Sequence, residues 1–138
     1  PKLSANASQI AWQLDNSDNQ LLPKMQTDIM LSQGNNILII DAKYYSHMTQ
    51  QQYGTNTLHS NNLYQIFTYV KNKEFELREL KHTVSGMILY AQTDEYIIPN
   101  NTYQMSGNQI SVRALNLNQD FSGIAHTLDD IIQNSFNN

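Results

Sequence analysis

The chain has 138 residues, with 8 Lys and Arg against 12 Asp and Glu, which gives a formal net charge of -4. This length and a hydrophobic fraction of 40% suit one domain with a single core, and no apolar run approaches the roughly 18 residues of a membrane-spanning helix. The absence of cysteine excludes disulfides, thiol nucleophiles and Cys-type zinc sites, and it favours a cytoplasmic protein.

The N-terminal part of the chain is expected to be mostly extended. Residues 7–14 alternate between apolar and polar side chains, which predicts a strand, and residues 24–32 predict a second extended segment. Residues 37–45 are rich in β-branched and aromatic side chains and begin apolar on both faces, as in a central strand that is covered on both sides. Because a turn signal at residues 33–36 separates the last two segments, we expect them to form a hairpin.

The polar stretch from residue 47 to 62 is expected to be a loop, and a helix is expected to follow it. This helix begins near Leu63 and ends around Lys73, with Asn61 or Asn62 as its cap. The apolar stripe of the helix consists of Leu63, Ile66, Phe67 and Val70.

The C-terminal part predicts one more strand, a hairpin and a helix. The strand covers residues 82–92, the hairpin covers residues 102–115 with its turn at 106–108, and an amphipathic helix covers residues 121–136. The chain shows no internal repeat and no linker, so we expect residues 1–138 to form a single mixed α/β domain.

The charges are unevenly distributed. An acidic chain argues at first against nucleic-acid binding, because phosphate contacts need Lys and Arg. From residue 19 to 73, however, the only carboxylates are Asp28 and Asp41. The same segment contains four lysines, which are Lys24, Lys43, Lys71 and Lys73. The central segment is therefore neutral to basic, and its two isolated acids are candidates for a function.

The expected hairpin brings these two acids together. If it closes symmetrically about Gly34 and Asn35, Asp28 lies directly opposite Asp41, and side chains paired in this way have Cβ atoms about 4.5–5.5 Å apart. Lys43 projects from the same face, two positions beyond Asp41. The patch therefore combines two carboxylates that can share a divalent cation with one amine.

This patch predicts metal-assisted hydrolysis of phosphodiester bonds. Two neighbouring carboxylates repel unless a cation neutralises them, and oxygen ligands without His or Cys favour Mg²⁺ or Mn²⁺ over zinc. We expect Asp28, Asp41 and the main-chain carbonyl of Ala42 to hold the metal. Lys43 is expected to position or activate the attacking water and to neutralise charge that develops on the phosphate. On spacing alone, the alternative is a structural Asp–Lys cluster at the surface.

Gln65 and Tyr69 are four residues apart on the expected helix and therefore share one face. That face differs from the apolar stripe. We therefore expect the pair to reach the metal site or the DNA backbone and not the core.

Several of these segments together resemble a known family. Residues 21–45 followed by 58–70 are similar to McrC, the nuclease subunit family of McrBC-type modification-dependent restriction systems. The resemblance rests on TD at 27–28, IIDAKYY at 39–45 and HSxNLYQ at 59–65, with weaker similarity at 86–90 and 114–121. TD, DAK and QIFTY also resemble the PD-(D/E)xK superfamily, including the QxxxY element of its RecB-like branch.

The resemblance implies a restriction-endonuclease-like fold, which is a mixed β-sheet flanked by helices, and a C-terminal fragment of a longer subunit. It matches Asp28, Asp41 and Lys43 to the catalytic motif and adds Gln65 as a further catalytic residue. It places His59 just before the helix of Gln65, where it can contact phosphate. The candidate DNA contacts are therefore His59, Tyr69 and Lys24.

The resemblance further implies a DNA endonuclease with a partner. The partner is McrB, a GTP-hydrolysing ring motor, and the substrate is double-stranded DNA that contains 5-methylcytosine. GTP is then used only through the partner, because this sequence has no glycine-rich phosphate loop. Two alternatives stay open, a non-catalytic module that docks on DNA or on the motor, and a RecB-like exonuclease domain of another pathway.

Overall fold

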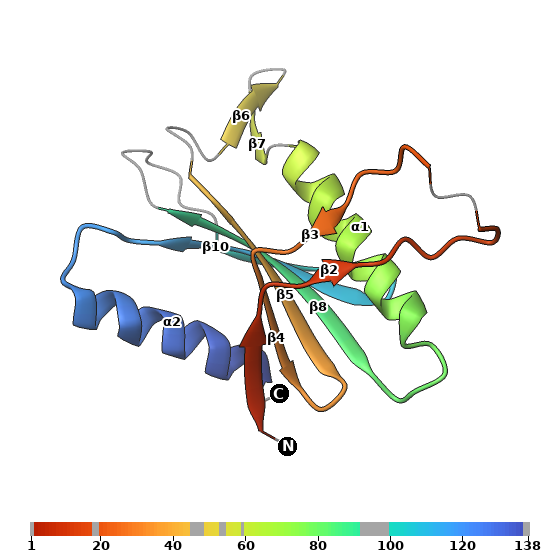
Figure 1. Ribbon diagram of the computed structural model, residues 1–138. Helices are drawn as coiled ribbons and strands as arrows, with labels where there is room; N and C mark the ends of the chain where they lie inside the picture. Colours follow the sequence, from red (N-terminus) through yellow and green to blue (C-terminus); the bar gives the residue numbers. More distant parts are fainter. Residues whose placement is uncertain are drawn as a thin grey trace.

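The computed structural model describes residues 2–17, 20–44, 49–52, 55–58, 60–91 and 100–136, and its centre is a six-stranded sheet (Figure 1). In spatial order the strands are β1 (Leu3–Asn6), β4 (Ile29–Gln33), β5 (Asn36–Lys43), β8 (Thr83–Ala91), β10 (Asn108–Leu115) and β9 (Asn101–Met105). β5 pairs with β8 and β8 pairs with β10 in parallel, whereas the other neighbours pair antiparallel. The sheet is therefore mixed, as the sequence predicted.

The helix α1 (Ser60–Glu76) covers one face of the sheet (Figure 1). It lies in the connection between β5 and β8, and two parallel neighbours require such a crossover. Ile66 and Val70 of α1 are completely buried against the sheet. A Cβ atom built on Gly86 of β8 would lie only 2.8 Å from a side-chain carbon of each of them, so glycine permits this close approach.

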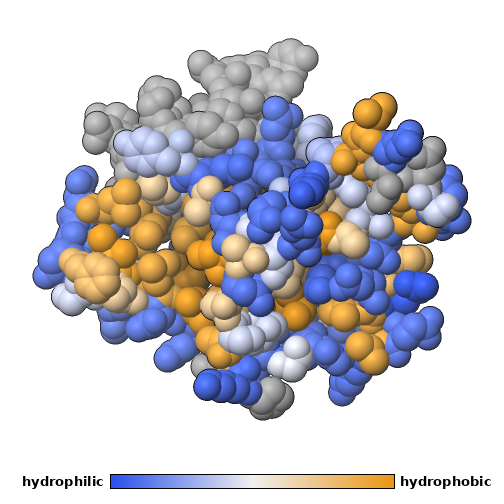
Figure 2. Space-filling view, in the orientation of Figure 1, coloured by the Kyte–Doolittle hydropathy of each residue, from blue (hydrophilic) through white to orange (hydrophobic). Residues whose placement is uncertain are grey.

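The helix α2 (Phe121–Phe136) lies on the opposite face and is attached more loosely, because none of its residues is fully buried. The α2 side chains that pack against the buried cluster of that face are Leu128, Ile131, Ile132 and Phe136. Figure 2 shows apolar surface gathered over the start of α2, and Phe121 is 85% exposed. A mixed sheet between two helices agrees with the PD-(D/E)xK-like fold that the resemblance implies.

The N-terminal extended segments are interrupted, which the sequence did not predict. Of the strand predicted over 7–14 only the short β2 (Gln9–Ile10) forms, and β1 precedes it; in place of one segment over 24–32 the structure has β3 (Met25–Gln26) and β4. The interruption lies at Thr27, which is 2% exposed. Its amide donates to the carbonyl of Ser8 at 2.9 Å, and its hydroxyl accepts from the Ser8 amide at 3.2 Å. These bonds join residues 19 positions apart, and one of them uses the Thr27 side chain, so a pattern of apolar residues does not reveal them.

Both predicted hairpins are confirmed. Gly34 adopts a positive φ of 63° in the β4–β5 turn, where Gln33 pairs with Asn36. In the β9–β10 turn, Ser106 and Gly107 have φ values of 50° and 88°. Two consecutive positive φ values are typical of the two-residue turns that join tightly paired strands.

The segment before α1 differs from the prediction of a loop. It contains β6 (Thr49–Gln52) and β7 (Thr55–Leu58), which pair antiparallel in a two-stranded sheet of their own. Since this ribbon is separate from the six-stranded sheet, its sequence need not carry the apolar alternation by which strands are identified.

The boundaries of α1 also differ from the prediction. The helix begins at Ser60 and ends at Glu76, three residues further at each end than expected. Asn62 lies inside the helix and is 3% exposed, so it is not a cap. Its Nδ2 donates to the Tyr90 hydroxyl at 2.8 Å, and this distant partner satisfies an amide that would otherwise favour a helix end.

Across the part of the chain that the structure describes, no helix combines the length and the apolarity needed to cross a membrane.

Candidate active site

Asp41 lies near the carboxyl end of β5 and points to the side of the sheet that α1 covers. Ile37 and Ile39 precede it at alternate positions and belong to the buried cluster that contains Ile66 of α1, so Asp41 continues the same face. The residue is only 4% exposed. A carboxylate at this position is therefore largely removed from water at the edge of the core.

Asp28 occupies the position that the hairpin register predicts. The β4–β5 ladder ends at the pair Ile29 and Ile40, and one step further places Asp28 opposite Asp41. Asp28 is exposed, and its Oδ2 accepts a hydrogen bond of 2.9 Å from the amide of Ala42. The carboxylate thus accepts the hydrogen bond that a backbone carbonyl of the neighbouring strand would otherwise accept, and this holds Asp28 against β5 where β4 begins.

The Ala42 contact also orients the backbone at this point. In an antiparallel pair the amide and the carbonyl of one residue point toward the same neighbouring strand. The Ala42 amide points to Asp28, so the Ala42 carbonyl is directed to the same side. The three oxygen donors predicted from the sequence, on Asp28, Asp41 and Ala42, therefore belong to one small region.

Lys43 connects Asp41 to α1. Its Nζ lies 3.1 Å from Asp41 Oδ2 and donates a hydrogen bond of 2.9 Å to Gln65 Oε1. The Lys43 side chain is 21% exposed. The ammonium group is therefore held by an anion on one side and by a neutral amide on the other, while it stays in reach of solvent.

Gln65 reaches the site as predicted, but Tyr69 does not reach the surface. Gln65 Nε2 donates to the Tyr69 hydroxyl at 2.9 Å, whereas Tyr69 is 7% exposed and belongs to the core cluster of α1. The prediction that Tyr69 avoids the core is therefore wrong, and its contact with DNA stays a prediction. A tyrosine has an apolar ring and a polar hydroxyl, so it can pack as a core residue and still support Gln65.

Burial raises the pKa of Asp41 above its ordinary value of 3.8. The neighbouring Lys43 lowers this pKa, and the carboxylate of Asp28 raises it further. Asp41 Oδ2 is fully buried and accepts no well-directed hydrogen bond within the described residues, so its contact with Lys43 is an ion pair only. A buried carboxylate oxygen without a hydrogen bond indicates that the site favours a cation.

These donors fit a hard divalent cation. Asp28, Asp41 and the Ala42 carbonyl supply only oxygen, which Mg²⁺ and Mn²⁺ prefer. No group of three or more His, Cys, Asp or Glu side chains gathers anywhere in the ranges that the structure describes. The site is thus suited to an ion that also binds water or substrate, and not to a cation enclosed by protein ligands alone.

The structure adds two buried residues that the sequence did not single out for the site. Tyr90 pairs with Lys43 in the β5–β8 register, is completely buried, and accepts the hydrogen bond from Asn62 of α1. This bond fixes the first turn of α1 to β8 at the strand position that lies beside Lys43. Asn62 and Tyr90 are 28 positions apart, so their spacing gives no signal in the sequence.

The remaining candidate DNA contacts are not part of this network. Lys24 is exposed and precedes β3, four positions before Asp28, where it lines a separate cavity. His59 lies outside the described residues. The assignment of DNA contacts to both residues stays a prediction.

Comparison with known proteins identifies the family. Residues 2–90 match the family described as McrBC 5-methylcytosine restriction system component, and this range contains every residue of the network above. The chain is 34% identical over 133 residues to the Type IV methyl-directed restriction enzyme EcoKMcrBC of Escherichia coli strain K12. The match covers 93% of this chain but 37% of the relative, so the chain spans little more than a third of that protein. We conclude that the chain belongs to the McrBC family of 5-methylcytosine restriction system components.

Proposed function

We propose that this chain is the Mg²⁺-dependent DNA endonuclease part of a modification-dependent restriction system, working in the cytoplasm. It hydrolyses phosphodiester bonds of double-stranded DNA that contains 5-methylcytosine, when an McrB-like GTP-hydrolysing ring motor drives the system. The observation that carries this proposal is the placement of Lys43 between Asp41 and Gln65, with Asp28 held opposite Asp41. The methyl-directed relative supports the class of substrate.

In this proposal Asp28, Asp41 and the Ala42 carbonyl hold the metal. When bound, Mg²⁺ or Mn²⁺ neutralises the two carboxylates and polarises the scissile phosphate. The hydrogen bond from the Ala42 amide fixes Asp28, while the strand backbone and the core fix Asp41. Both carboxylates are therefore positioned before substrate arrives, which is what electrostatic catalysis requires.

Lys43 acts on the phosphate and on the attacking water. An ammonium group has three N–H donors, and within the described residues one faces Asp41 and one is bound by Gln65. The third is available for a phosphate oxygen or for the water. As the reaction proceeds, the ammonium stabilises the negative charge that develops on the phosphate oxygens. Gln65 keeps this donor in place by accepting the hydrogen bond from Lys43.

The charge distribution agrees with a nuclease that depends on a partner. A net charge of -4 provides few phosphate contacts, and these contacts supply most non-specific affinity for DNA. We therefore expect the chain to bind DNA weakly by itself. The motor partner supplies both GTP hydrolysis and delivery of the DNA.

Cleavage of methylated DNA, with the cognate motor, GTP and Mg²⁺ present, tests the proposal. Asp41→Ala and Lys43→Ala should each abolish cleavage while the GTPase activity of the complex persists. The matched controls are Asp129→Ala on α2 and Lys81→Ala, both exposed and on other parts of the fold. Retained cleavage in both site variants overturns the proposal.

Metal binding separates the proposed nuclease from a non-catalytic docking module. Calorimetric titration with Mn²⁺ should show binding to the wild-type chain in the presence of DNA. Asp28→Asn and Asp41→Asn should weaken that binding strongly, whereas Asp129→Asn should leave it unchanged. If the wild-type chain binds no Mn²⁺ under these conditions, the docking module is the better description.

A further inference from the structure

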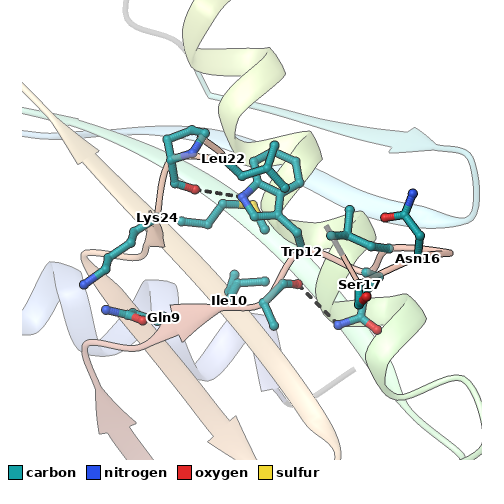
Figure 3. A pocket seen from close by; sticks show the side chains of 12 residues that line it. Gln9, Ile10, Trp12, Asn16, Ser17, Leu22 and Lys24 are labelled. Atoms are coloured by element: carbon teal, nitrogen blue, oxygen red, sulfur yellow. Dashed lines mark hydrogen bonds between the residues drawn. The ribbon is translucent and has the colours of Figure 1, made fainter. Parts of the chain in front are cut away.

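The strands β2 and β3 pair antiparallel in a two-stranded ribbon of their own. A cavity of about 450 Å³ lies beside this ribbon, and neither Asp28 nor Asp41 lines it (Figure 3). Its walls come from β2 and β3 and from the connection between them. Figure 3 shows Trp12 and Leu22 near the middle, with Lys24 and Gln9 at one end and Asn16 and Ser17 at the other. Nothing in the proposed hydrolysis uses this cavity.

Trp12 provides a fixed aromatic surface in the cavity. Its Nε1 donates a hydrogen bond of 2.7 Å to the carbonyl of Pro23, on the opposite side of the ribbon connection. The side chain is partly buried and packs against the core cluster of α1. Because the indole N–H is already satisfied and the ring is held, Trp12 offers a ligand mainly its ring, and that suits stacking with another planar group.

The charge of the cavity selects a class of ligand. Lys24 is the one charged side chain among the described residues that line it, and no carboxylate is among them. Neutral polar side chains, such as those of Gln9, Gln13 and Ser17, make up much of the remaining wall. An aromatic ring, neutral hydrogen-bonding groups and one cation together fit a nucleotide, which combines a planar base with a phosphate.

The cavity is close to the candidate active site along the chain. Met25 and Thr27 are buried, and the alternate residues Lys24, Gln26 and Asp28 are exposed. Four residues of extended chain span at most about 13 Å, at roughly 3.3 Å each. This distance corresponds to about four nucleotide steps of roughly 3.4 Å along one strand of a duplex. A single DNA strand can therefore reach both sites.

We propose that this cavity binds an unpaired base of the substrate strand, within about four nucleotides of the bond to be cut. The inference rests on the proposed nuclease function. The base stacks on Trp12, and its phosphate pairs with Lys24. A base inside a duplex cannot enter such a cavity without leaving its stack, so the site selects DNA that is locally opened beside the point of cleavage.

Trp12 is the single tryptophan of the chain, so its intrinsic fluorescence reports directly on this cavity. The chain is titrated in EDTA with a short single-stranded oligonucleotide and, separately, with the fully paired duplex of the same sequence. We expect saturable quenching by the single strand at concentrations where the duplex gives little change. Equal quenching by both forms, or no quenching by the single strand, overturns the proposal.

Variants test the two contacts separately, with binding followed by the anisotropy of a labelled oligonucleotide. Trp12→Ala should weaken binding of the single strand roughly 5- to 150-fold, the range for loss of one stacked base. Lys24→Gln, which leaves the core untouched, should reduce the slope of log affinity against log salt by about 0.7. Lys81→Gln is the matched control and should leave the slope unchanged. An unchanged slope in Lys24→Gln contradicts the phosphate contact even if Trp12→Ala fails to fold.

The outcome is distinguishable from failure of the proposed nuclease function. Asp41→Ala should remove cleavage and leave the Trp12 quenching intact, because the two sites use different residues. A chain that cleaves DNA but shows no quenching keeps the nuclease proposal and overturns the base-binding cavity. A chain that shows quenching but no metal-dependent cleavage in the complete system overturns the nuclease proposal, and with it the position of the base beside a cut, but it keeps the cavity as a base-binding site.

Discussion

Lys43 Nζ donates a hydrogen bond of 2.9 Å to Gln65 Oε1, which joins the end of β5 to the first half of α1. Gln65 Nε2 in turn donates to the Tyr69 hydroxyl at 2.9 Å, so one amide connects the proposed catalytic amine to a buried tyrosine. An amide can accept and donate at the same time, which a methylene chain of the same length cannot do. The position of Lys43 therefore depends on α1 as well as on its own strand.

Gln65→Met should lower the rate of DNA cleavage by about 10- to 100-fold, a typical effect of removing a residue that orients a catalytic group. The variant keeps the length of the side chain and loses both hydrogen bonds. We expect kcat to fall and the DNA concentration at half-maximal rate to change little. Both are measured with the motor partner, GTP and Mg²⁺ present. Gln133→Met, at an exposed position of α2, is the control. A normal kcat in Gln65→Met shows that Lys43 is positioned without Gln65.

Tyr69→Phe should cost about 0.5–1.5 kcal/mol of unfolding free energy, the usual contribution of one hydrogen bond, because the ring keeps its place in the core. Denaturant unfolding measures this loss, and Tyr64→Phe at an exposed position is the control. Cleavage should fall less than in Gln65→Met. Both variants break the hydrogen bond between Gln65 and Tyr69. The double variant should therefore cleave DNA only slightly more slowly than Gln65→Met. If the effects of the two single variants on cleavage add fully in the double variant, Gln65 and Tyr69 do not act together.

Asp41 predicts a pH dependence of stability in the metal-free chain. Burial raises the pKa of Asp41 in the folded state above 3.8, so between 3.8 and the raised value the folded chain binds more protons than the unfolded chain. The Asp41 contribution to stability is therefore fully present below about pH 3.8 and is lost as the pH rises through the folded-state pKa.

Asp41→Asn removes this titration and should gain stability relative to wild type as the pH rises from 3.8. Urea unfolding in EDTA at a series of pH values measures the difference, with Asp129→Asn as the background variant. A difference between Asp41→Asn and wild type that stays constant over this range contradicts a raised pKa.

Gly86→Ala should destabilise the fold by about 1–3 kcal/mol, the range for one extra group in a packed core. The new methyl group would meet Ile66 and Val70 at 2.8 Å, and β-branched side chains inside a helix have little freedom to move away. Thermal unfolding measures the loss. Ser85→Ala, the neighbouring position on the other face of β8, should change stability by less than about 0.5 kcal/mol. Since α1 must shift to admit the methyl group, cleavage should also fall.

The sequence determined the parts of the site that depend on local pairing. Gly34 and Asn35 form the β4–β5 turn, and the register of the ladder then places Asp28 opposite Asp41 without help from the rest of the fold. The alternation of a strand likewise places Lys43 on the same face as Asp41. The helices and the other hairpin were also identified, because their periodicity and turn residues are local.

Only the tertiary structure decided the environment of these groups. The pairing of β5 with β8 brings Tyr90 beside Lys43, and the crossover brings Gln65 to the Lys43 amine. These contacts join residues more than twenty positions apart, and no periodicity encodes them. The break at Thr27 was missed because its hydrogen-bond partner, Ser8, is distant in the sequence. The burial of Tyr69 was missed because its ring packs in the core formed with the sheet, while its hydroxyl still bonds to Gln65. The sequence thus placed two acids and an amine on one face, and the packing of α1 on the sheet determined how they are buried and held.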